Sequence, residues 1–74
     1  EALKQGGNMP CVLNASNEIV VEAFLQDKIG FLQMSDVIEK TMQKVSLIKN
    51  PSLDDYINSD EEARRIAKEL LLIS

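Results

Sequence analysis

The stretch of residues 10–25 constrains the fold most, because its apolar residues are too closely spaced for a helix that lies on a surface. A surface helix shows a single apolar stripe, about 100° wide. Here the apolar side chains cover most of the circumference, and Pro10 suits the first helical position because its φ is already helical. The stretch predicts a central helix packed on several sides. Its apolar residues are Val12, Leu13, Ala15, Ile19, Val20, Val21, Ala23, Phe24 and Leu25.

A narrow polar face interrupts this helix. Asn14, Asn17 and Glu18 follow one another at i, i+3 and i+4, so they project from one side. Asparagine is a mediocre helix former because its side chain competes for backbone hydrogen bonds, so two of them within a helix indicate a local partner. We expect both asparagines to bond backbone groups of the loops at residues 6–7 and 29–32. The alternative is a binding face that reaches the active site of a neighbouring domain.

The rest of the chain predicts more helices and no sheet, because no segment alternates convincingly between apolar and polar residues. Ser35 is expected to cap a helix whose apolar residues keep helical spacing as far as Ile48. Asn50 and Pro51 should end this run, and the helix should fray after Lys44. Ser59 and Glu62 match the capping-box pattern, so the last helix should begin there. The predicted fold class is all-α, a small bundle of three to four helices around the central buried helix at residues 10–25. The apolar face of the last helix is expected to carry Ala63, Ile66, Ala67, Leu70 and Ile73.

Two connections should hold these helices together. Residues 29–32 read Ile-Gly-Phe-Leu and predict a loop whose large apolar side chains pack down, with Gly30 allowing an unusual backbone shape. Ser52 should cap a short turn before the last helix. Phe24 is expected where the central helix meets its neighbours, so replacing it with alanine would cost roughly 3–5 kcal/mol.

Residues 1–7 predict the tail of a helix that belongs to a preceding part of a longer chain. Gly6 and Gly7 would stop it, since glycine readily takes the left-handed conformation that closes helices. Five helical residues are not stable alone in water, because helix nucleation is costly. We therefore expect residues 1–74 to be one domain of a longer polypeptide.

The composition excludes several classes of function. The 74 residues carry a formal net charge of −4 and no basic cluster, which disfavours nucleic acid and anionic membrane surfaces as partners. No apolar run approaches the ~20 residues that span a bilayer. The chain also has no histidine, which excludes Ser-His-Asp and Cys-His catalytic groups and zinc sites that use imidazole.

Two features could carry chemistry, and for both we favour a structural interpretation. Cys11, in the first turn of a helix, could be a reactive thiol with a lowered pKa, but a small buried side chain is the interpretation that we prefer. The acidic residues between Asp54 and Glu62 do not form a calcium loop, since Asp54, Tyr56 and Asn58 fail its ligand pattern. We interpret these acids as a solvated surface with carboxylates placed favourably at helix starts.

Three short motifs run through the first half of the chain. They are Leu-Asn-Ala-Ser-Asn-Glu at residues 13–18, Ala-Phe-Leu at residues 23–25 and Lys-Ile-Gly-Phe at residues 28–31. With them, the chain resembles the C-terminal domain of the 1-deoxy-D-xylulose 5-phosphate reductoisomerase family. That family usually has alanine where this chain has Ser16. The resemblance extends to Gly6, Gly7 and Pro10 upstream and to Leu53, Asp54, Asp55, Asp60, Ala63 and Arg64 downstream.

The resemblance implies a structural domain of an NADPH-dependent enzyme that also requires a divalent metal, Mg or Mn. Such an enzyme converts 1-deoxy-D-xylulose 5-phosphate to 2-C-methyl-D-erythritol 4-phosphate in the non-mevalonate route to isoprenoid precursors. The resemblance further implies a homodimer in the bacterial cytoplasm or in a plastid. The NADPH-binding and catalytic domains would lie upstream, so no catalytic, cofactor-binding or metal-binding residue is assigned here and the isolated chain should be inactive. The candidates for structural and domain contacts are Asn14, Asn17, Glu18, Gly30 and Phe31.

Two other classes remain open at this stage. An acyl or peptidyl carrier protein is also small, acidic and helical, but it needs an Asp-Ser-Leu site. Ser46 and Ser52 both precede leucine, yet Val45 and Pro51 occupy the aspartate position. A free-standing helical interaction module is the third class.

Overall fold

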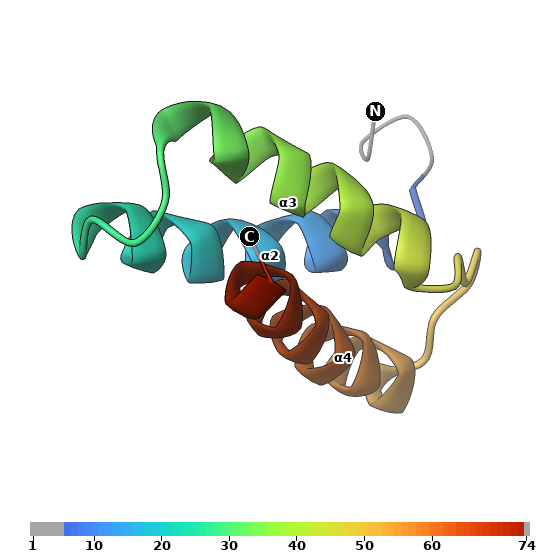
Figure 1. The fold of residues 1–74 in the computed structure, drawn as a ribbon. Helices are drawn as coiled ribbons and strands as arrows, with labels where there is room; N and C mark the ends of the chain where they lie inside the picture. Colours follow the sequence, from blue (N-terminus) through green and yellow to red (C-terminus); the bar gives the residue numbers. More distant parts are fainter. Residues whose placement is uncertain (1–5, 74) are drawn as a thin grey trace.

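The structure is a computed structural model that describes residues 6–73, and over this range the chain forms three helices and no strand. Helix α2 spans Met9–Leu25, α3 spans Phe31–Lys44 and α4 spans Leu53–Ile73 (Figure 1). The predicted all-α bundle is confirmed. The expected helix tail at residues 1–5 lies outside the described residues.

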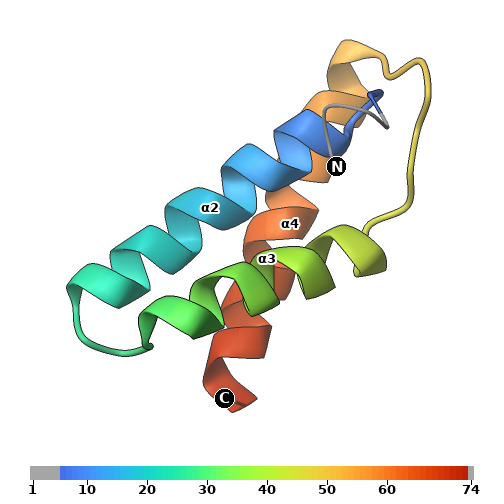
Figure 2. The same cartoon turned by 90° about the horizontal axis from the view of Figure 1, so that it is seen from above.

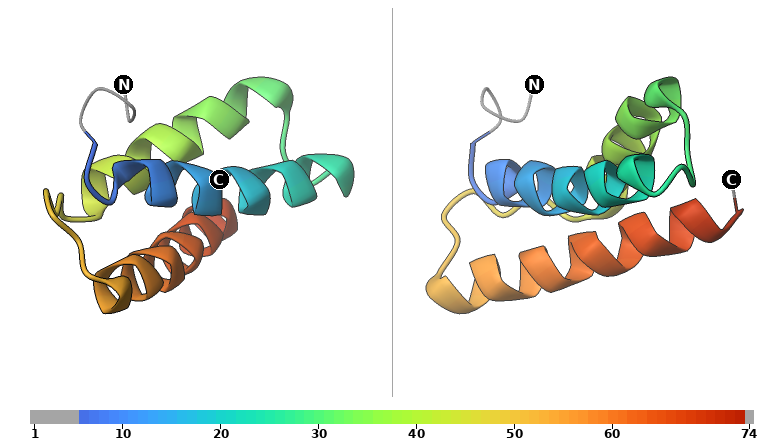
Figure 3. Two further views of the ribbon diagram at one scale, coloured as in Figure 1. Left: turned by 180° about the vertical axis from the view of Figure 1, so that it is seen from behind. Right: turned by 90° about the vertical axis from the view of Figure 1, so that its left-hand side faces the viewer.

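The helices pack so that each contacts the other two. Helices α2 and α3 lie side by side and antiparallel, and α4 crosses this pair (Figure 2). Seen from the side, α4 lies beneath the layer that α2 and α3 form (Figure 3). Helix α2 therefore buries one side against α3 and another against α4, which leaves its remaining side open.

The core consists mainly of small side chains. Ala63 and Ala67 of α4 are fully buried one turn apart, so the backbone of α4 can approach α2 closely. This confirms the inward face predicted for α4 at Ala63, Ile66 and Ala67. One buried cluster contains Met9, Val12, Ala15, Val45, Ala63 and Ile66, and the other contains Ile19, Val20, Ala23, Ile29, Val37 and Ala67.

The start of α3 was predicted wrongly. The helix begins at Phe31 with Gly30 as its N-cap, and the Gly30 N–H donates to Oε1 of Gln33 at 2.8 Å. Leu32 lies five residues before the buried Val37, which at 3.6 residues per turn puts it about 140° away, on the outer side of the helix. Phe31 and Leu32 are accordingly 74% and 83% exposed, whereas Ile29 is buried. The expected packed-down loop is thus an exposed helix start, and the expected cap, Ser35, lies inside α3.

Helix α3 ends where fraying was predicted, and not at Asn50 and Pro51, where the run of apolar residues was expected to end. The helix stops at Lys44, and Val45 is extended and buried. From there, residues 45–52 connect α3 to α4.

The start of α4 lies earlier than predicted. The Ser52 N–H donates to Oδ2 of Asp55 at 3.0 Å, and the Asp55 N–H donates to Oγ of Ser52 at 3.1 Å. This reciprocal pair caps a helix that begins at Leu53, so the expected short turn is the first turn of α4. Ser59 lies inside the helix and is buried, which rules out a helix start at Ser59 and Glu62.

Phe24 does not lie in the core. Its side chain is 38% exposed in the last turn of α2, and its ring meets the Phe31 ring edge-on with centroids 6.3 Å apart. The core positions in this part of α2 are Val20 and Ala23 instead. The loss of 3–5 kcal/mol of stability predicted for Phe24→Ala assumed a buried Phe24, and that assumption was wrong.

Candidate functional site

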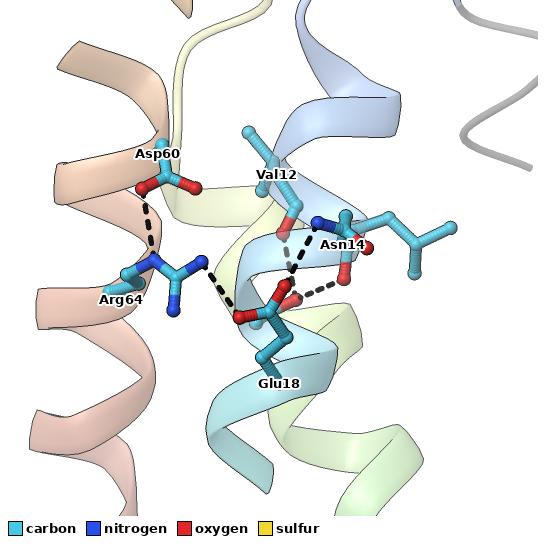
Figure 4. A network of polar contacts seen from close by, with 7 residues as sticks. Val12, Asn14, Glu18, Asp60 and Arg64 are labelled. Carbon is cyan, nitrogen blue, oxygen red and sulfur yellow. Dashed lines mark hydrogen bonds and ion pairs between the residues drawn. The ribbon is translucent and has the colours of Figure 1, made fainter. Parts of the chain in front are cut away.

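The predicted polar face of α2 forms a cluster with α4, made of Asn14, Glu18, Asp60 and Arg64 (Figure 4). Nη2 of Arg64 donates to Oε1 of Glu18 at 3.0 Å, and Nε of Arg64 donates to Oδ2 of Asp60 at 2.9 Å. Nδ2 of Asn14 donates to Oε2 of Glu18 at 3.2 Å. One guanidinium thus connects two carboxylates on different helices.

This cluster has the properties of a structural ion pair. The hydrogen bonds that Arg64 donates to Asp60 and Glu18 raise the pKa of the guanidinium, which keeps its charge in any case. The Arg64 side chain is one third exposed and that of Glu18 about half exposed. Pairs in such positions contribute ~0–1 kcal/mol, so the cluster orients α2 on α4 more than it stabilises them.

The partners predicted for Asn14 and Asn17 were wrong. Asn14 is exposed and bonds Glu18 on its own helix, not the backbone of a loop. Asn17 is also exposed, and its amide forms no hydrogen bond with any other residue in the range 6–73. Both side chains lie exposed on the surface of α2, and neither reaches the backbone of the two loops. Asn17 therefore has unused hydrogen-bonding capacity on the open side of α2.

Asn8 carries the long-range polar contacts that the sequence did not reveal. Its Nδ2 donates to the Ser46 carbonyl and to Oγ of Ser59, both at 2.9 Å, and its Oδ1 accepts from the Ile48 N–H at 2.8 Å. The Asn8 backbone N–H adds a bond to the Ile48 carbonyl at 3.1 Å. We call Asn8 with these three partners the Asn8 anchor. Asn8 is fully buried and fixes the start of α2 to the α3–α4 connection and to the second turn of α4.

Gly7 allows this anchor to form. Gly6 and Gly7 both have the positive φ expected for glycines that end a helix, at 67° and 59°. Gly7 has a second constraint, because a Cβ built on it would lie 2.2 Å from the Ile48 carbonyl oxygen. A Cβ atom built on Gly6 would have no neighbouring atom within 4 Å. The close approach of Gly7 to the chain at Ile48 could not be read from local spacing, because the two residues lie 41 positions apart.

Cys11 does not have the environment of an activated thiol. It is half-buried, and its Sγ donates to the Tyr56 carbonyl at 3.5 Å. Burial raises the pKa of the Cys11 thiol, the nearby Asp60 carboxylate adds to the rise, and Arg64 opposes it. A reactive cysteine needs a lowered pKa, so the structural interpretation fits better.

No group of three Cys, Asp or Glu side chains within residues 6–73 is placed to hold a metal ion. In the same range, every helix is too short or too polar to cross a membrane. The two remaining candidates, Gly30 and Phe31, lie at the exposed end of the bundle where α2 turns into α3.

The chain was then compared with known proteins. A family model described as the DXP reductoisomerase C-terminal domain matches residues 1–66. The 1-deoxy-D-xylulose 5-phosphate reductoisomerases of Phocaeicola vulgatus and Bacteroides fragilis are 63% and 61% identical to the chain over 71 residues. These alignments cover 96% of this chain but 19% and 18% of the two relatives. The chain thus spans about a fifth of the length of the relatives that it matches.

The fold was also compared with solved structures. The 1-deoxy-D-xylulose 5-phosphate reductoisomerase from Zymomonas mobilis, in complex with NADPH, is 45% identical to the chain. It superposes with a TM-score of 0.86, and the match covers 96% of this chain and 19% of that one.

Proposed function

Because the chain belongs to the family of DXP reductoisomerase C-terminal domains, we propose that it is the C-terminal helical domain of a longer 1-deoxy-D-xylulose 5-phosphate reductoisomerase. The observation that carries the proposal is that sequence and fold both match along nearly the whole chain. The family match leaves no support for the acyl-carrier alternative. In this proposal residues 1–74 form a single domain, and residues 1–7 enter it from the preceding part of the polypeptide.

The longer protein would rearrange 1-deoxy-D-xylulose 5-phosphate and reduce it to 2-C-methyl-D-erythritol 4-phosphate with NADPH. The proposal includes a divalent metal, Mg or Mn, a homodimeric assembly, and a location in the bacterial cytoplasm or a plastid. The residues of this chain do not fit a metal site, since the described range offers no suitable set of ligands. The sequence also has no glycine-rich dinucleotide fingerprint. We therefore assign NADPH and metal binding to other domains and derive no reaction step from this chain.

The contribution of this chain is structural. The Asn8 anchor joins the point where the polypeptide enters the domain to both the α3–α4 connection and α4. The Glu18–Arg64 ion pair adds a second connection between α2 and α4. A domain joined in this way can support a neighbouring catalytic domain as one body, without contributing a catalytic residue.

The test is an activity assay on two proteins. The full-length product of the source gene and the isolated 74-residue chain are each mixed with NADPH, Mg²⁺ and 1-deoxy-D-xylulose 5-phosphate, and the loss of NADPH absorbance is followed. We expect substrate-dependent oxidation by the full-length protein and none by the isolated chain. Folded full-length protein that oxidises no NADPH would overturn the proposed activity, and oxidation by the isolated chain would overturn the structural role.

A further inference from the structure

The open side of α2 is hollowed along its length. One hollow of about 360 Å³ is lined by Pro10, Leu13, Asn14 and Asn17. A second hollow, of about 470 Å³, continues from Asn17 past Glu18 and Val21 towards Leu25. The two hollows share Asn17, so they form one surface about 22 Å long at 1.5 Å per helical residue. We call this surface the outer face of α2, and its residues are Pro10, Leu13, Asn14, Asn17, Val21 and Leu25.

The outer face of α2 has the composition of a contact surface. Leu25 is 74% exposed, so its large apolar side chain lies open to water. Val21 and Leu13 are half-buried, and Leu13 also packs against a core cluster. Asn17 lies between them with no hydrogen-bond partner in the described part of the chain. Apolar surface with a few polar groups that can bond is typical of a surface that another part of a protein covers.

We propose that the outer face of α2 docks against another segment of the same longer polypeptide. This inference rests on the proposed function, in which most of the polypeptide lies outside this chain. About four fifths of the length of each matched relative is outside the aligned region, so ample chain exists to cover the face. A covalently attached segment also has a high effective concentration, which favours it over a separate molecule.

The charges on this side of α2 argue against a second copy as the occupant. Glu22 lines the second hollow and forms no ion pair with another residue in the range 6–73. A symmetric contact uses the same patch on both copies, so it would bring Glu22 carboxylates towards each other. An attached segment can instead place a Lys or Arg beside Glu22. In the docked state the Asn17 amide bonds the backbone of that segment.

The experiment measures how fast engineered cysteines are alkylated in the full-length protein. Leu25→Cys probes the outer face, and Leu53→Cys is the matched control, because both leucines are 74% exposed. Asn17→Cys is a second probe in case Leu25→Cys does not fold. Each variant is treated with iodoacetamide in buffer and in urea, and labelling is quantified for the individual peptide by mass spectrometry.

We expect the Leu25→Cys and Asn17→Cys thiols to react at least about ten-fold slower in the native protein than in urea, and the Leu53→Cys thiol to react within about three-fold of its rate in urea. The protection should not change when the protein is diluted. Probe thiols that react as fast in buffer as in urea overturn the proposal. Protection that disappears on dilution also overturns it, because the occupant is then a second copy.

The same protein separates this inference from the proposed function. NADPH oxidation by the unmodified full-length protein reports on the function, and thiol protection reports on docking. If the probe thiols are protected but NADPH is not oxidised, the proposed function is rejected and the docked face is retained. If NADPH is oxidised but the probe thiols are unprotected, only the docking proposal is rejected.

Discussion

Gly7 and Asn8 show how two adjacent residues set the geometry of this domain. Gly7 lets the chain pass so close to Ile48 that no side chain fits between them. Asn8 then uses its amide to bond the α3–α4 connection and Ser59 of α4. Both residues act over separations of about forty residues or more, which is why neither role was visible in the local sequence. Local spacing identified only a helix stop at Gly6 and Gly7.

Gly6 and Gly7 offer a matched pair of substitutions. Both have positive φ, so alanine at either position costs ~1–2 kcal/mol of backbone strain. Gly7→Ala also drives a Cβ into the Ile48 carbonyl, whereas Gly6→Ala meets open space. Urea denaturation of the chain, followed by circular dichroism, should show a clearly larger loss of unfolding free energy for Gly7→Ala. Equal losses for the two variants would mean that the close approach at Ile48 is not present in solution.

Cys11 provides a pH-dependent prediction. Burial raises the pKa of its thiol in the folded chain, with the Asp60 carboxylate adding to the rise, so the folded thiol keeps its proton to a higher pH than the unfolded one. As pH rises from the unfolded to the folded pKa, the unfolded chain loses its proton first, and the stability that this thiol contributes falls. Alkylation of Cys11 by iodoacetamide should therefore begin at a higher pH in buffer than in urea. A native profile that begins at a lower pH would restore the reactive-thiol interpretation.

At the scale of helices, the sequence predicted which segments are helical better than where they start. The period of apolar residues located α2 and the inward face of α4. It also continued to Ile48, beyond the end of α3 at Lys44. The starts of α3 and α4 were wrong because several residues near each start can act as caps, and a cap contributes only about 1 kcal/mol. Differences that small are decided by long-range contacts. Ser59 illustrates this, since its hydroxyl accepts from Asn8 inside the bundle and does not cap a helix.

The two possible starts of α4 predict different mutational effects. Asp55 accepts from the Ser52 N–H in the observed cap, so Asp55→Ala should lower the unfolding free energy by about 0.5–1 kcal/mol. Glu62 has no capping role in the structure, so Glu62→Ala should change it by less than about 0.5 kcal/mol. The two variants are compared by the urea concentrations at the midpoints of their unfolding transitions. A larger loss of unfolding free energy for Glu62→Ala than for Asp55→Ala would favour a helix start at Ser59.

At the scale of the whole molecule, many of the large apolar side chains are exposed, and the buried core is made mostly of small ones. Alanine and valine fill much of the core, which limits the free energy that burial supplies. Periodicity in the sequence could not predict this arrangement, because it identifies apolar faces but not whether their partners lie within the 74 residues. The predicted candidates Asn14, Asn17 and Glu18 do share one side of α2. Glu18 bonds Asn14 and Arg64 there, whereas Asn17 bonds no other residue in the range 6–73. The exposed large apolar residues are Phe24, Leu25, Phe31, Leu32, Leu47, Leu53, Tyr56, Ile57 and Leu72.

We propose that this chain supports a longer protein through its fold and contributes no catalytic residue. Asn17 tests it most directly, because it is the polar residue of α2 whose amide is free to reach a neighbouring domain. The measurement is the melting temperature and steady-state kcat of Asn17→Ala in the full-length protein. The account predicts a lower melting temperature, because an amide that bonds the docked segment is lost, with near-normal kcat at low temperature. A large fall in kcat at an unchanged melting temperature would contradict it and would place Asn17 in the active site.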